Sequence, residues 1–162
     1  MLFRSSQAPV PEPETFESRW PQPPGIIIDS PQASYAGNWL AGGLSPEKHG
    51  LTYRYARTIT TTDIPTATAT FTPHLPAAGE YHVYVWYSMG DQRSAKAKYQ
   101  IVYQDGSIEV LLDQNKDSAR WVRIGRALKF ASGTSGFVRL CNDTGELDKL
   151  VIADAVRFVT AK

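Results

Sequence analysis

The residue types that most often do chemistry are sparse in this sequence and do not form a recognisable catalytic motif. The three histidines, His49, His74 and His82, lack the spacing of metal ligands. The run GTSG at 133–136 does not have the G-x-S-x-G order of a hydrolase nucleophile turn. The carboxylates are scattered mostly through turns, so no glycosidase acid–base pair can be nominated. We therefore predict that the chain is not an enzyme, has no metal site and uses no cofactor.

One polar run has part of the pattern of a calcium-binding loop. Asp113 to Asp117, DQNKD, places oxygen ligands at alternate positions. The sixth position is Ser118, where such loops need glycine, and the twelfth is Ile124, where they carry a glutamate. We interpret the run as a polar hairpin loop and leave calcium binding open. Asn142 begins an N-x-T pattern, which matters only in a secreted eukaryotic protein.

Aromatic residues on expected strands offer a clearer binding chemistry. Sugar rings present apolar C–H faces bordered by hydroxyls, which suit flat aromatic rings beside planar polar groups. The aromatic residues in question are Trp39, Tyr53, Tyr55, Tyr84, Trp86 and Trp121. Arg93 and Arg120 could add paired hydrogen bonds to an acidic sugar. Alternatively the aromatic rings fill the core. The candidate glycan-binding residues are Trp39, Tyr84, Trp86, Arg93, Arg120 and Trp121.

These side chains need a scaffold, and from residue 25 onward the pattern is that of short strands. Runs rich in Val, Ile, Thr, Tyr and Phe alternate with turn residues, which predicts an all-β, antiparallel β-sandwich of jelly-roll type. Asp105 and Gly106 predict a hairpin turn. The predicted strands cover 25–29, 52–58, 66–72, 80–87, 97–103, 108–112, 120–125, 127–131, 136–141 and 150–159.

The period of two along the run 80–87 gives it two apolar faces. We predict that the core face carries Tyr81, Val83, Val85 and Tyr87. The opposite face has three possible covers, namely a glycan, the edge of the second sheet or a neighbouring subunit, and it carries His82, Tyr84 and Trp86.

Two further residues of the expected sandwich, Asp154 and Cys141, carry a carboxyl group and a thiol whose surroundings can be predicted. Asp154 falls on an otherwise apolar strand face, where we expect Arg54 or Arg57 to pair with it. Cys141 is the single cysteine, and we interpret it as a buried thiol.

Length and composition predict one domain preceded by an arm. The sequence has 162 residues, and residues 1–24 hold six of its eleven prolines. We assign 1–24 to a proline-rich N-terminal arm and 25–162 to the sandwich. The arm is expected to dock on its own domain or on a neighbouring subunit through Phe3, Phe16 and Trp20.

Charge and hydropathy exclude two classes of partner. The formal net charge is +1, which gives no field to attract nucleic acid. No apolar run has the length of a signal peptide core or a membrane-spanning helix, so membrane insertion is not expected.

Six segments in a fixed order carry a family resemblance. They are GIIIDSPQASYAGNW, YRYA, ATFTPHLPAAGEYHVYVWY, DQNKDSARWVRIG, GTSGFVRLCND and VIADAVRFV. The ordered set resembles the golvesin C-terminal and xanthan-lyase carbohydrate-binding-domain family. The resemblance implies a non-catalytic β-sandwich module that binds bacterial polysaccharide or a surface glycan, typically attached to extracellular enzymes. An alternative, from architecture alone, is a structural, decoration or fibre subunit of a particle such as a phage virion, docked through the arm.

Overall fold

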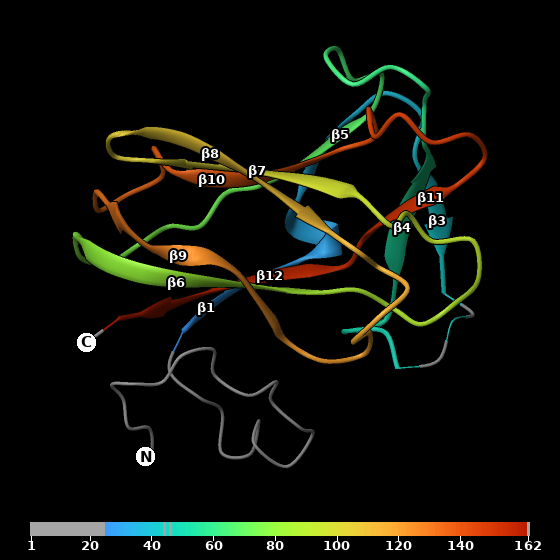
Figure 1. The fold of residues 1–162 in the computed structure, drawn as a ribbon. Helices are drawn as coiled ribbons and strands as arrows, with labels where there is room; N and C mark the ends of the chain where they lie inside the picture. The colour runs from blue at the N-terminus through green and yellow to red at the C-terminus, as the bar shows by residue number, and fades with distance from the viewer. Residues whose placement is uncertain (1–24, 44, 46, 162) are drawn as a thin grey trace.

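The computed structural model describes residues 25–43, 45 and 47–161, and within them the chain is built almost entirely of strands (Figure 1). The predicted arm residues Phe3, Phe16 and Trp20 lie outside the described residues. The elements are β1 (Ile26–Asp29), the 3-10 helix η2 (Ser30–Gln32), β2 (Ser34–Ala36), β3 (Leu40–Gly42), β4 (Tyr53–Arg57), β5 (Thr68–Phe71), β6 (Gly79–Trp86), β7 (Ala97–Tyr103), β8 (Gly106–Leu112), β9 (Val122–Phe130), β10 (Phe137–Cys141), β11 (Leu150–Ala153) and β12 (Ala155–Thr160).

The strands form three antiparallel sheets. One has the order β1-β12-β6-β9, the second β2-β5-β10-β7-β8, and these two lie face to face as a sandwich (Figure 1). The third, β11-β4-β3, lies at one end of the sandwich (Figure 1). The predicted all-β antiparallel sandwich is confirmed. Within the described residues, no helix has the length and apolar character needed to cross a membrane.

The core lies between the two larger sheets, where alternate residues of each strand point inward. The predicted core face of β6 is confirmed, because Tyr81, Val83, Val85 and Tyr87 are all buried. The facing sheet contributes buried apolar residues, among them Ala69, Phe71, Tyr99, Ile101, Val138 and Leu140. Removing this apolar surface from water is the main stabilisation of the sandwich.

The final apolar run is two strands instead of the single one predicted. β11 pairs with β4 in the third sheet, and β12 pairs with β6 and β1 in the sandwich. Asp154 stands alone between them. The alternating pattern continues through this residue, so it does not reveal that the chain changes sheets there.

The opposite error occurs at residues 120–131, where two strands were predicted and one long strand forms. Gly125, with φ of 68°, lets β9 continue with a local irregularity, and the β6–β9 register shifts between Tyr81 and Val83. The predicted hairpin turn is confirmed between β7 and β8, where Tyr103 faces Gly106. Cys141 is buried as predicted, and burial raises the pKa of its thiol to about 11.

Asn142, the first residue of the N-x-T pattern, is a buried structural group. Its Oδ1 accepts hydrogen bonds from the backbone N–H groups of Thr66 and Ala67, at 3.0 Å each. Its Nδ2 donates to the Arg57 carbonyl at 2.9 Å and to Thr66 Oγ1 at 3.0 Å. One amide side chain thus ties the end of β10 to the segments around β4 and β5.

Candidate functional site

A surface hollow of about 320 Å³ lies against the third sheet. Its wall combines three small residues with two tyrosines, an arginine and a leucine. The lining residues are Ala41, Gly42, Gly43, Tyr53, Tyr55, Arg93 and Leu150. This combination of flat rings and hydrogen-bond donors makes the hollow the candidate functional site.

Strand register brings the tyrosines to the hollow. Tyr53 and Tyr55 are two residues apart on β4, so they share one face, and their ring centroids are 6.2 Å apart. Gly42 lies opposite Tyr53, and Leu40 lies opposite Tyr55. A Cβ at Gly42 would come within 2.4 Å of the Tyr53 ring, so the glycine leaves the space that the ring occupies. Leu40 is 54% exposed and adds an apolar edge beside Tyr55.

Backbone hydrogen bonds hold Arg93 beside the same sheet. The Leu150 N–H donates to the Gln92 carbonyl at 2.8 Å, and the Ser94 N–H donates to the Leu150 carbonyl at 2.7 Å. Arg93 therefore forms a parallel bridge with Leu150 at the outer edge of β11. Its Nη2 donates to the Met89 carbonyl at 2.8 Å. The guanidinium group is thus held beside Met89 and over Gly90, where a Cβ would lie 2.2 Å from Nη2.

A buried amide fastens the third sheet to the sandwich. Gln114 Nε2 donates to the Tyr99 hydroxyl at 2.9 Å and to the Ile152 carbonyl at 3.1 Å. The Ile152 N–H donates to Gln114 Oε1 at 2.8 Å. Because Tyr99 is on β7 and Ile152 on β11, this group sets the position of the sheet that forms the hollow.

The predicted aromatic candidates do not form an exposed platform. Tyr84, Trp86 and Trp121 make a small buried cluster with Ala155, and Trp86 and Trp121 are only 3% and 1% exposed. Their rings meet edge to face at 5.5 Å. The Trp86 indole N–H donates to the Glu47 carbonyl at 3.0 Å. The outer face of β6 is thus covered in part by the loop before β4 and by the residue before β9.

The remaining predicted residues divide between buried, exposed and hollow-lining positions. Trp39 is buried, packs edge to face on Tyr35 at 5.4 Å and donates its indole N–H to the Ala36 carbonyl. Arg120 is exposed and lies 4.0 Å from Asp117 in an ion pair. Only Arg93 among the six candidates lines the hollow. The predicted list omitted Tyr53 and Tyr55, although both were recognised as strand aromatics, because sequence does not give the register that places them beside Gly42.

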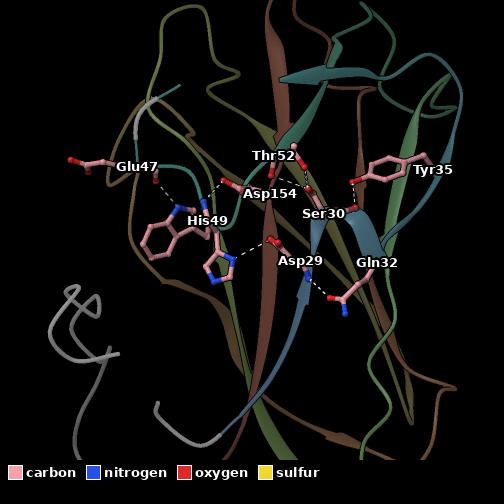
Figure 2. Close-up of polar contacts among 9 residues, drawn as sticks. Asp29, Ser30, Gln32, Tyr35, Glu47, His49, Thr52 and Asp154 are labelled. Carbon is pink, nitrogen blue, oxygen red and sulfur yellow. Dashed lines mark hydrogen bonds and ion pairs between the residues drawn. The ribbon is translucent and has the colours of Figure 1, made fainter. Parts of the chain in front are cut away.

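A second group of polar residues lies at the junction of β1, β12 and the loop before β4 (Figure 2). The His49 N–H donates to Asp154 Oδ2 at 3.0 Å, and His49 Nδ1 lies 3.1 Å from Asp29 Oδ1. Burial raises the pKa of the Asp154 carboxyl to about 8, with a smaller contribution from Asp29. The His49 N–H and Lys48 act in the opposite direction.

This arrangement corrects the predicted pairing of Asp154. Arg54 lies over the Tyr35 ring at 4.9 Å, and Arg57 pairs with Asp148 at 3.5 Å, so neither arginine reaches Asp154. His49 also packs edge to face on Trp86 and Trp121, which closes this junction with aromatic rings. Among the residues that the structure describes, no group of three or more His, Cys, Asp or Glu side chains could hold a metal ion.

The polar run at 113–117 is a local turn. Asp113 Oδ1 accepts hydrogen bonds from the backbone N–H and the side-chain Nδ2 of Asn115, both at 2.9 Å. These bonds lower the pKa of the Asp113 carboxyl. The Asp113 carboxylate therefore binds its own loop, as expected of a polar hairpin connection.

Comparison with known proteins assigns the chain to a protein family. The model of the golvesin C-terminal domain matches residues 26–160. Xanthan lyase from Bacillus sp. (strain GL1) is 29% identical over 143 residues, which make up 86% of this chain and 15% of that protein. The chain thus spans a small part of this curated relative.

Solved structures show the same fold. The structure of Paenibacillus xanthan lyase superposes with a TM-score of 0.74 at 23% identity, covering 85% of this chain and 13% of that one. A family 35 carbohydrate-binding module from Clostridium thermocellum superposes with a TM-score of 0.56 at 12% identity, covering 86% of this chain and 100% of the module. Since the family match extends from β1 to the end of β12, the chain belongs to the golvesin C-terminal domain family.

Proposed function

We propose that this chain is a non-catalytic glycan-binding module and that the hollow beside Tyr55 and Arg93 holds the sugar. The observation that carries the proposal is the hollow itself, where two tyrosines, an arginine and the partly buried Leu150 meet. The partly buried ring of Tyr55 can contact the apolar face of a sugar, and the phenol hydroxyls and Arg93 can bond its hydroxyl groups.

The comparisons support the proposal at the level of the fold. Several superposed structures are carbohydrate-binding modules of families 35 and 6. The matched relative is a polysaccharide lyase by name, but this chain corresponds to a small fraction of it, so its activity is not transferred. The proposed ligand class is a polysaccharide or surface glycan met outside the cell.

Titration of neutral and acidic bacterial polysaccharides by calorimetry tests the proposal. We expect measurable binding by the wild type and about tenfold weaker binding by Tyr55→Ala, because the ring contact is lost. Tyr103→Ala is the matched control, since Tyr103 is also partly buried but lies beside the β7–β8 turn, at the other end of the sandwich (Figure 1). Absence of binding to every glycan, or equal losses in the two variants, would refute this site.

A further inference from the structure

Arg93 has more hydrogen-bonding capacity than the protein uses. The guanidinium group carries five N–H donors, and within residues 25–43, 45 and 47–161 it makes a single hydrogen bond, from Nη2 to the Met89 carbonyl. The Nε atom is buried and has no hydrogen-bond partner within the described part of the chain. Desolvated donors of this kind are costly unless another group accepts from them.

The described part of the chain also supplies no countercharge to Arg93, although the residue is only 7% exposed. Among the described residues, no carboxylate forms an ion pair with it, and the acidic neighbour in sequence, Asp91, is exposed. The partly buried amine of Lys98 behaves differently, because its Nζ lies 2.7 Å from Asp143 Oδ2. The described part of the chain therefore pairs Lys98 with a carboxylate and does not pair Arg93, which is one of the residues that line the hollow.

Among the described residues that line the hollow, Arg93 alone carries a charge. The described residues that line it include no aspartate or glutamate, and the tyrosine rings, glycines and Leu150 carry no charge. A positive group in a partly desolvated hollow attracts an anion more strongly than the same group in open water. A planar guanidinium group fits a planar carboxylate best, because two parallel hydrogen bonds can form.

We propose that the hollow selects acidic glycans, with the carboxylate of a uronic acid residue against the Arg93 guanidinium group and the sugar ring against Tyr55. This inference rests on the proposed function, since it names the ligand class of the same hollow. In this proposal Arg93 determines the preference for acidic over neutral glycans, and Tyr55 contributes affinity for both kinds.

The test compares an oligomer of galacturonic acid with its fully methyl-esterified form, which has the same sugar backbone but carries an uncharged methyl ester in place of each carboxylate. We expect the wild type to bind the acid form about tenfold more tightly or better, because a hydrogen-bonded ion pair is gained. Arg93→Gln should remove the preference. Arg120→Gln should keep it, because Arg120 is exposed and does not line the hollow. Thermal unfolding of each variant checks that it is folded.

The outcomes separate this inference from the proposed function. Equal binding of both probes by the wild type overturns the acidic preference, while a loss on Tyr55→Ala would still support glycan binding. Binding of neither probe also overturns the preference, and the wider polysaccharide panel then decides the proposed function alone. If Arg93→Gln unfolds, Arg93→Lys replaces it, because lysine keeps the charge without the planar fork. A reduced preference in Arg93→Lys supports the inference, and an unchanged preference overturns it.

Discussion

Replacing Asp154 with asparagine should remove a pH dependence of stability that this buried carboxyl creates. Burial, with a smaller contribution from Asp29, raises the pKa of Asp154 from 3.8 to about 8 in the folded chain. Between these values the folded state holds a proton that the unfolded state has released. Stability contributed by the neutral acid is therefore complete below the unfolded value and is lost as pH rises towards the folded value.

The expected slope follows from this linkage. Between about pH 5 and about pH 8, the wild type should lose ~1.4 kcal/mol of unfolding free energy per pH unit relative to Asp154→Asn. The whole effect is on the order of 5 kcal/mol, from a pKa raised from 3.8 to about 8. Urea unfolding at several pH values measures it. Asp148→Asn is the matched control, because the Asp148 side chain is 68% exposed and should leave the wild-type slope unchanged.

His82 contributes a slope of the opposite sign in part of this range. Burial and, to a smaller extent, Arg123 lower the pKa of its imidazole below 6.5. The unfolded chain then binds the extra proton, so this contribution to stability is lost as pH falls below 6.5. Both proteins share this slope, so it cancels in the difference between wild type and Asp154→Asn. Parallel pH profiles for the two, or a wild type that gains relative stability as pH rises, would refute the reasoning.

Two further predictions concern the uncharged residues Asn142 and Gly42. Asn142→Ala should lower the unfolding free energy by about 2–4 kcal/mol in urea titration, because four hydrogen bonds are lost and buried backbone groups are left unpaired. The control Asn38→Ala, at an exposed residue, should change the unfolding free energy little. Equal effects of the two substitutions would contradict the role of Asn142. Gly42→Ala should displace the Tyr53 ring, lower stability by about 1–3 kcal/mol and weaken glycan binding in calorimetry, since its Cβ would lie 2.4 Å from Tyr53 Cζ. Gly43→Ala is its control, because the nearest atom lies at 3.8 Å, and matching losses in both variants would exclude the steric explanation.

The sequence was sufficient for the fold class and for the core face of β6. Alternation along β6 identified inward-facing residues such as Val83 and Val85, because a buried face requires every second side chain to be apolar. Strands β2 and β3 were not predicted, since three residues rich in Ser, Ala and Gly carry no period. Pairing partners decide such short strands, and sequence alone does not specify them.

The candidate site was only partly predictable for a related reason. The period of two showed that Trp86 lies opposite the core face, but not that His49 and Trp121 would pack against it. Arg93 was identified by its residue type, and its neighbours in the hollow depend on the register of β3, β4 and β11. Long-range pairing therefore accounts for most of what the sequence did not reveal about the hollow.

The passage of the chain from β11 to β12 through the single residue Asp154 has a mechanical consequence. No flexible connection separates the wall of the hollow from a central strand of the sandwich, and Gln114 adds a second fastening between β7 and β11. Displacing the wall would strain the core, so the hollow is held in its final shape before a ligand arrives. Pre-organisation of this kind reduces the conformational entropy lost on binding, and a polysaccharide bound as proposed would pull directly on the body of the domain.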